Sequence, residues 1–205
     1  FTAEDELDAD LLALRLERAL EGAPFRFEQM PVTSIGGPQY WLPQMGNFAQ
    51  FTKPRHYADH LTRMRGIPEH LEATMAQMRA GMAAGRVPPR VIMPKALAQA
   101  ESLVAGRYAD RPETHPLMQP FNERAGEVYR DEAARVLLDE VLPAYERFAA
   151  FLENEYIPAC RATFGASEGI DGPAAYDYAV RVQTTLDVTA DEVHEIGLRE
   201  VARIK

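Results

Sequence analysis

An apolar stripe that meets two prolines is the feature that most constrains the fold of this chain. From residue 137 to residue 156, large apolar side chains recur every three or four positions, as on one face of an α-helix. The stripe consists of Leu137, Val141, Tyr145, Phe148, Leu152 and Tyr156. A helical turn that contains a proline loses a backbone hydrogen bond and must accommodate the ring. We therefore expect a long helix that kinks or breaks at Pro143 and Pro158.

Helical spacing also predicts the elements of the N-terminal half. Thr2 can cap a helix over about residues 3–21, which Gly22 ends. Thr52 can cap another helix, and the break at residues 66–68 separates it from a third. The inward rows of this helical hairpin are Tyr57, Leu61 and Met64, then Leu71, Met75, Met78 and Met82.

The predicted fold class is all-α, an irregular multi-helix array with a long aromatic-rich loop. No segment alternates apolar and polar residues for long enough to predict a strand, and no internal repeat is visible. We expect one helical region over residues 1–205. It consists of N-terminal helices with the aromatic loop (1–106) and a long kinked helix with the C-terminal helices (107–205).

Residues 23–51 hold many aromatic side chains outside the predicted helices. Prolines and glycines, including the Gly36–Pro38 triplet, exclude a long helix here. A loop of this length inside a compact domain is unusual and often functional. In one interpretation the loop wraps the surface and its aromatic rings insert into the core. In the other, residues 36–44 line a cleft.

Composition excludes several classes of protein. The net charge is −9 and no Lys/Arg-rich run occurs, which argues against a nucleic-acid partner. No apolar run approaches the length of a transmembrane span, so no membrane-crossing segment is expected. Cys160 is the single cysteine, so no internal disulfide can form.

Three sequence patterns resemble known metal or nucleophile sites, and each lacks a residue that such a site requires. His56 and His60 have the helical spacing for one metal, but no third ligand beyond Asp59 is evident. His194 followed by a glutamate starts an H-E-x-x-H motif, but position 198 is Leu, so no zinc site is predicted. A nucleophilic Cys160 would need a histidine partner, and the neighbouring sequence offers none.

The C-terminal segment, residues 176–205, has the clearest local sequence signals for a helix. Thr189 and Glu192 form a capping box at the start of a helix. The apolar face of this helix is formed by Val193, Ile196, Gly197, Val201 and Ile204. Glu200 falls on that face, where a buried carboxylate would need an ion-pair partner or a role beside a cleft. No helix stop signal precedes Lys205, so we expect the element to continue beyond it.

Several segments together resemble the bacterial domain-of-unknown-function family 885. The strongest are Gly172–Tyr178 and Gln183–Ile204. Further support comes from residues 36–43, 81–90, 142–145 and 151–158. The resemblance covers most of the chain.

The resemblance implies the N-terminal part of a longer, mainly helical protein similar to zinc metallopeptidases of the carboxypeptidase-like kind. The expected zinc motif, His-Glu-x-x-x-x-His-His, is absent from this sequence. We therefore expect no metal ligand, cofactor or catalytic residue in this chain, which alone should be inactive. Zinc is expected in the missing C-terminal half, peptide is the expected substrate of the full-length protein, and an exported or periplasmic location is favoured.

The resemblance also implies that this chain contributes one wall of the substrate cleft. The candidate substrate-binding residues are Tyr176, Gln183, Thr184 and Thr185. Gln183 stands where a histidine is expected in the family. Gln183, Thr184 and Thr185 lie at the end of a predicted helix, so they could equally cap the next turn. Glu200 is the candidate for a carboxylate that positions the substrate-binding residues without contacting the substrate itself. The alternative function is a non-catalytic helical binding or scaffold domain that uses the 36–48 loop as its contact site.

Overall fold

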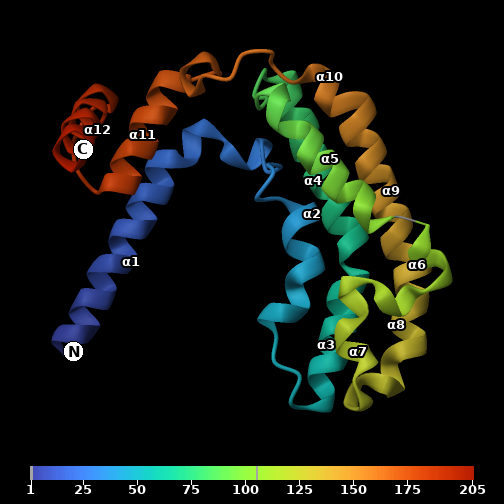
Figure 1. The fold of residues 1–205 in the computed structure, drawn as a ribbon. Coiled ribbons are helices and arrows are strands. Elements are labelled where there is room, and N and C mark those ends of the chain that lie inside the picture. The colour runs from blue at the N-terminus through green and yellow to red at the C-terminus, as the bar shows by residue number, and fades with distance from the viewer. Residues whose placement is uncertain (1, 105) are drawn as a thin grey trace. The chain divides into compact units, whose positions relative to one another are not determined.

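The computed structural model describes residues 2–104 and 106–205, and the chain divides into two compact units. The larger unit is Glu28–Phe164, and the smaller combines Phe1–Phe27 with Gly165–Lys205. Residue 106, which divides the expected helical region into two groups of helices, lies inside the larger unit. Figure 1 shows that helices form both units. The described residues include no β-strand, only two isolated bridges, which confirms the all-α fold class.

The larger unit is an array of α-helices joined by short 3₁₀ turns. Its α-helices are α2 (Pro38–Trp41), α3 (Pro54–Arg65), α4 (Ile67–Ala83), α5 (Met93–Leu103), α6 (Arg107–Asp110), α7 (Gln119–Asn122), α8 (Arg130–Val136), α9 (Leu142–Phe151) and α10 (Ile157–Ala159). Both α4 and α5 pack along α9, and the three lie side by side in Figure 1. Their facing side chains, together with those of α3 and α8, form one continuous apolar core.

The predicted long helix contains two π-helical turns. Leu137–Val141 is π-helical between α8 and α9, and Leu152–Tyr156 is π-helical between α9 and α10. Each π turn ends immediately before the turn that contains Pro143 or Pro158. A proline cannot donate a backbone hydrogen bond, and its ring crowds the carbonyl four residues earlier. Widening the preceding turn to five-residue hydrogen bonds lets the helix continue past each ring.

The apolar stripe that predicts this helix is confirmed as its inner face. All six stripe residues are buried against the rest of the core. The Tyr145 hydroxyl donates a hydrogen bond to the carbonyl of Pro38 at 3.2 Å, so even its polar atom is satisfied. The π turns therefore keep the stripe on one side of the helix despite the two prolines.

The helical hairpin of α3 and α4 follows the prediction in its packing but not in its cap. Tyr57, Leu61 and Met64 of α3 are buried, as expected. The N-cap of α3 is Lys53, not Thr52, and no side-chain hydrogen bond caps this end. Pro54 supplies the first helical residue, where its missing N–H leaves no donor unpaired, so a capping threonine is not required.

The smaller unit contains three long helices, α1 (Ala3–Gly22), α11 (Gly172–Thr184) and α12 (Ala190–Ile204). Both predicted caps are confirmed. Thr2 accepts from the N–H of Asp5 at 3.2 Å, and Thr189 accepts from that of Glu192 at the same distance. Within the described residues, no helix has the length and apolarity to cross a membrane.

Candidate functional site

The candidate site in the smaller unit lies where the end of α1 packs against α11. Gly22 makes this close approach possible, because a Cβ atom there would lie 2.4 Å from the hydroxyl oxygen of Tyr178. That hydroxyl donates to the carbonyl of Arg18 at 2.8 Å. The rings of Phe25 and Phe27 lie beside the same tyrosine, with centroids 5.4 and 6.0 Å from its ring. Tyr178 therefore joins the two helices.

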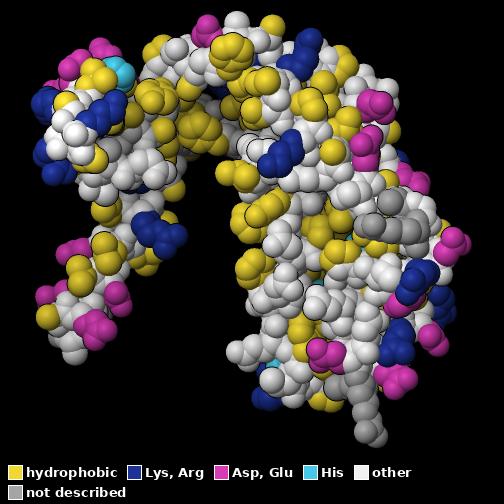
Figure 2. All heavy atoms as spheres, viewed as in Figure 1, with side chains coloured by type: hydrophobic (Ala, Val, Ile, Leu, Met, Phe, Trp, Pro, Cys, Tyr) yellow, Lys and Arg dark blue, Asp and Glu magenta, His cyan; other side chains and the backbone are white. Residues whose placement is uncertain are grey.

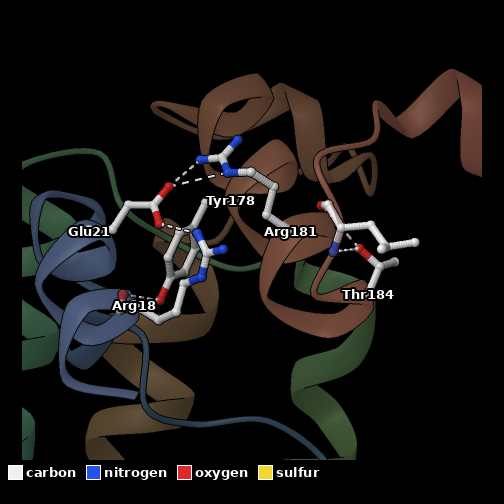
Figure 3. A network of polar contacts seen from close by, with 6 residues as sticks. Arg18, Glu21, Tyr178, Arg181 and Thr184 are labelled. Atoms are coloured by element: carbon white, nitrogen blue, oxygen red, sulfur yellow. Dashed lines mark hydrogen bonds and ion pairs between the residues drawn. The ribbon is translucent and has the colours of Figure 1, made fainter. Parts of the chain in front are cut away.

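An ion-pair network reinforces this contact, as Figure 3 shows. The Glu21 carboxylate accepts from Arg18 at 2.7 Å through one oxygen and pairs with Arg181 through the other. The hydrogen bond from Arg181, and then that from Arg18, lowers the pKa of Glu21 below its ordinary value. Glu21 thus stays charged and links a guanidinium of α1 to one of α11.

A groove of about 400 Å³ lies beside the network. Its walls are mainly apolar and carry two guanidinium groups. The residues that line it are Leu14, Arg15, Arg18, Ala19, Tyr178, Val182 and Thr185. Arg18 is held by Glu21, whereas Arg15 makes no ion pair with any described residue. The groove can therefore accept an apolar group with a negative or carbonyl oxygen nearby.

Among the predicted substrate-binding residues, Thr185 lines this groove. Its backbone has a φ of 60°, a left-handed conformation that is rare for a β-branched residue. Its N–H donates to the carbonyl of Arg181 at 2.9 Å and so ends α11. The conformation costs on the order of 1–3 kcal/mol, and strain of this kind is typical of functional positions.

Thr184 caps the same end of α11. Its hydroxyl donates to the carbonyl of Val180 at 2.7 Å and accepts from the N–H of Leu186 at 3.2 Å. Thr184 therefore has a capping role, because its hydroxyl is hydrogen-bonded to backbone atoms on both sides of the end of α11.

Tyr176 and Gln183 are exposed and lie seven residues apart, so they share one side of α11. Tyr178 and Val182 occupy the other side, where the groove is. The structure therefore does not bring Tyr176 and Gln183 to the groove. Tyr176 and Tyr178 are two residues apart, which is more than half a helical turn, so their side chains point to opposite sides of α11.

Glu200 lies on α12 and is exposed in the part of the chain that the structure describes. Its partner is Arg203 of the same helix, at 2.7 Å. The apolar residues around it are also exposed, including Ile196, Val201 and Ile204. In the described unit this face has no cover, so Glu200 remains in contact with solvent.

Sequence reasoning missed Arg18, Glu21, Tyr178 and Arg181. The contacts between α1 and α11 join residues 160 positions apart, which no local pattern reveals. A usable signal was present within α11, because Tyr178, Val182 and Thr185 recur at helical spacing.

The histidine pair on α3 does not form a metal site. The Nε2 atom of His60 donates to the carbonyl of Leu117 at 3.1 Å, and burial lowers the pKa of this imidazole. His56 instead accepts at Nδ1 from the N–H of Thr52 at 3.2 Å. Across residues 2–104 and 106–205, no three or more His, Cys, Asp or Glu side chains cluster as metal ligands.

Cys160 is buried, and this burial raises the pKa of its thiol to about 11. At neutral pH the group is a protonated thiol, which is a poor nucleophile. The cysteine-hydrolase interpretation therefore has no support in the geometry.

The part of the aromatic loop that belongs to the larger unit, residues 28–51, exposes part of its aromatic surface. Trp41 is 51% exposed and Phe48 is 73% exposed, and their ring centroids are 6.4 Å apart. Phe51 packs against the core, as the wrapping interpretation expects. That interpretation is wrong for Trp41 and Phe48, because the 3₁₀ helix Leu42–Phe48 turns its core-facing side chains, Leu42 and Met45, inward instead.

The family model for a bacterial protein of unknown function, DUF885, matches residues 1–205. The chain therefore belongs to this family. A comparison with curated proteins found no match.

Among solved structures, a "putative lipoprotein" from Colwellia psychrerythraea has a similar fold, with a TM-score of 0.77 and 22% sequence identity. The alignment covers 85% of this chain and 31% of that chain. This chain thus corresponds to about a third of that larger protein.

Proposed function

We propose that this chain is a non-catalytic helical region of a larger hydrolase of the zinc-metallopeptidase type, in which it forms one wall of the substrate cleft. Membership of family 885 places the chain among bacterial proteins of unknown function, and the hydrolase type is our proposal from the sequence resemblance described above. The observation that carries it is the α1–α11 groove, where an apolar lining, two arginines and the strained Thr185 converge.

The groove residues would bind the substrate and hold its orientation. Leu14 and Val182 offer apolar surface to a side chain of a peptide. Arg15 has a free guanidinium that can take a carboxylate or a carbonyl oxygen. The described residues do not fit a zinc ion, so its ligands would come from sequence outside residues 1–205 and no chemical step is assigned to this chain.

The test compares the isolated chain with the full-length protein. We expect no bound zinc and no peptide hydrolysis for residues 1–205 alone, and both for the full-length protein. Metal analysis of the pure proteins and a mixed peptide substrate provide the readouts. One tightly bound zinc per isolated chain, or peptide turnover by it, would contradict the proposal.

The groove itself is tested by Arg15→Gln in the full-length protein. Because the proposed contact serves ground state and transition state alike, we expect KM to rise about tenfold with kcat unchanged. Glu17→Gln, which alters another charged position of α1, is the control and should leave KM unchanged. An unchanged KM for Arg15→Gln would exclude the groove as the substrate wall.

We also propose an exported location, which the lipoprotein description of the similar structure supports. Fractionation of cells that produce the full-length protein tests this. Recovery in the cytoplasmic fraction alone would exclude it.

The exposed ring pair Trp41 and Phe48 favours a second candidate, a binding or scaffold domain that uses residues 36–48. Exposed aromatic clusters are typical of contact surfaces. A self-contained domain of this kind should be a monomer on size exclusion and unfold in one sharp transition. Aggregation or dimerisation of the isolated chain would instead favour the hydrolase region.

A further inference from the structure

A second hollow lies in the larger unit, between the end of the aromatic loop and α3. Its volume is about 280 Å³. Its lining residues are Phe48, Ala49, Gln50, His56, Asp59 and Arg63. Phe48 also belongs to the exposed ring pair of the second candidate function, whereas none of the roles proposed above uses the other lining residues. The pocket needs no residue from outside the chain, so it stands independently of the proposed hydrolase.

The polar side of the pocket is one face of α3. His56, Asp59 and Arg63 are spaced by three and four residues, so they lie above one another on the helix. This face is adjacent to the buried face that carries Tyr57 and Leu61. Packing of the inner face therefore fixes the side of α3 from which the three polar side chains project.

Each polar side chain has a defined hydrogen-bonding role. Because Thr52 donates to Nδ1 of His56, the neutral imidazole carries its proton on Nε2 and is a donor there. Arg63 offers a guanidinium fork, and Asp59 offers a carboxylate. These last two are four residues apart, yet no ion pair joins them, or either of them to another described residue. The pocket thus presents a positive and a negative group that are both available.

Phe48 supplies an apolar rim. Its ring is largely exposed and tilts against that of Trp41. Covering an exposed aromatic ring with an apolar group removes both surfaces from water and is favourable. A ligand with one apolar side chain would therefore gain from this rim as well as from the charges.

We propose that this pocket binds a free amino acid with an apolar side chain. The ligand carboxylate pairs with Arg63 and the Nε2–H of His56, its ammonium pairs with Asp59, and its side chain covers Phe48. Pockets for drug-sized ligands measure about 300–1,000 Å³, so this smaller volume suits a single amino acid. The C-terminal residue of a peptide shares the carboxylate and the side chain but lacks the ammonium at that position.

The test titrates the chain with L-leucine, N-acetyl-L-leucine and L-leucinamide by calorimetry. Fluorescence of Trp41, the single tryptophan, gives a second readout beside the rim. We expect saturable binding of leucine, and at least tenfold weaker binding of leucinamide and of the N-acetyl compound. Preference for the N-acetyl compound would identify a peptide terminus as the source and overturn the free amino acid. Absence of saturation by any of the three would overturn the site.

Variants assign the contacts. We expect Arg63→Gln and Asp59→Asn each to weaken leucine binding at least tenfold, and Asp59→Asn to leave N-acetyl-leucine unaffected. Arg55→Gln removes the same charge from α3 outside the pocket lining and should bind like the parent. All three positions are exposed, so the variants should fold, which circular dichroism checks. Equal affinity of Arg63→Gln and Arg55→Gln would refute the assignment.

Discussion

The two units use the same helical periodicity with opposite outcomes. In the larger unit, the apolar stripe of the long helix is buried to the last residue. In the smaller unit, the leucines of α1 are exposed, Leu20 by 75%, and Figure 2 shows hydrophobic and acidic side chains together on the surface of this helix. Apolar spacing therefore identifies a face that favours burial, whereas neighbouring elements decide whether burial occurs.

The comparison also explains how each unit is held together. The larger unit relies on an apolar core contributed by many helices. The contact between α1 and α11 relies on one tyrosine, one close glycine and a chain of ion pairs. Removing volume from a packed core lowers the free energy of unfolding strongly, whereas an exposed ion pair contributes little to it. The following predictions test this difference, from the largest expected effect to the smallest.

The reaction rate of the Cys160 thiol should report unfolding of the larger unit. With its pKa raised from 9.0 to about 11, native protein holds about a hundredfold less thiolate than an ordinary cysteine, and burial limits access further. We expect reaction with a disulfide reagent at pH 8 to be at least about a hundred times slower in native protein than in urea. Equal rates would show that the core around Cys160 is open.

Phe148→Ala should destabilise the larger unit by about 3–5 kcal/mol, because it removes a fully buried ring from the helix stripe. Urea unfolding followed by Trp41 fluorescence measures the change. Leu16→Ala on α1 is the control, since its side chain is exposed and the transition should shift by less than about 0.5 kcal/mol. Similar losses for both variants would contradict the contrast between the units.

Gly22→Ala should disrupt the contact of α1 with α11, because the added methyl group would overlap the Tyr178 ring. We expect a loss of about 1–3 kcal/mol in the smaller unit, seen as faster hydrogen exchange over residues 172–184. Gly197→Ala is the matched control. No atom lies within 4 Å of its added Cβ, so the better helix propensity should stabilise α12.

Glu21→Gln should change the acid response of the smaller unit. The folded pKa of Glu21 is depressed by Arg181 and then Arg18, so its contribution is present above the unfolded pKa. That contribution disappears as pH falls through the folded value. Hydrogen exchange over residues 172–184 should therefore accelerate in acid less in Glu21→Gln than in the parent. Glu17→Gln, at an exposed position of α1, should keep the parental response.

The sequence by itself determined the class of fold and many local features. The all-α class, the stripe of the long helix and the caps at Thr2 and Thr189 all depend on interactions within a few residues. Such interactions are encoded in spacing and residue type, so they are readable without coordinates. The family resemblance was equally available from short segments and is confirmed over residues 1–205.

The tertiary structure decided what these elements face. It placed a π-helical turn before each of Pro143 and Pro158, and it left Glu200 in solvent beside Arg203. It also selected Tyr178 over Tyr176 as the residue at the groove, through a bond to Arg18 across 160 positions. Burial and pairing depend on distant segments that compete for the same face, and that competition is resolved only when the chain is packed.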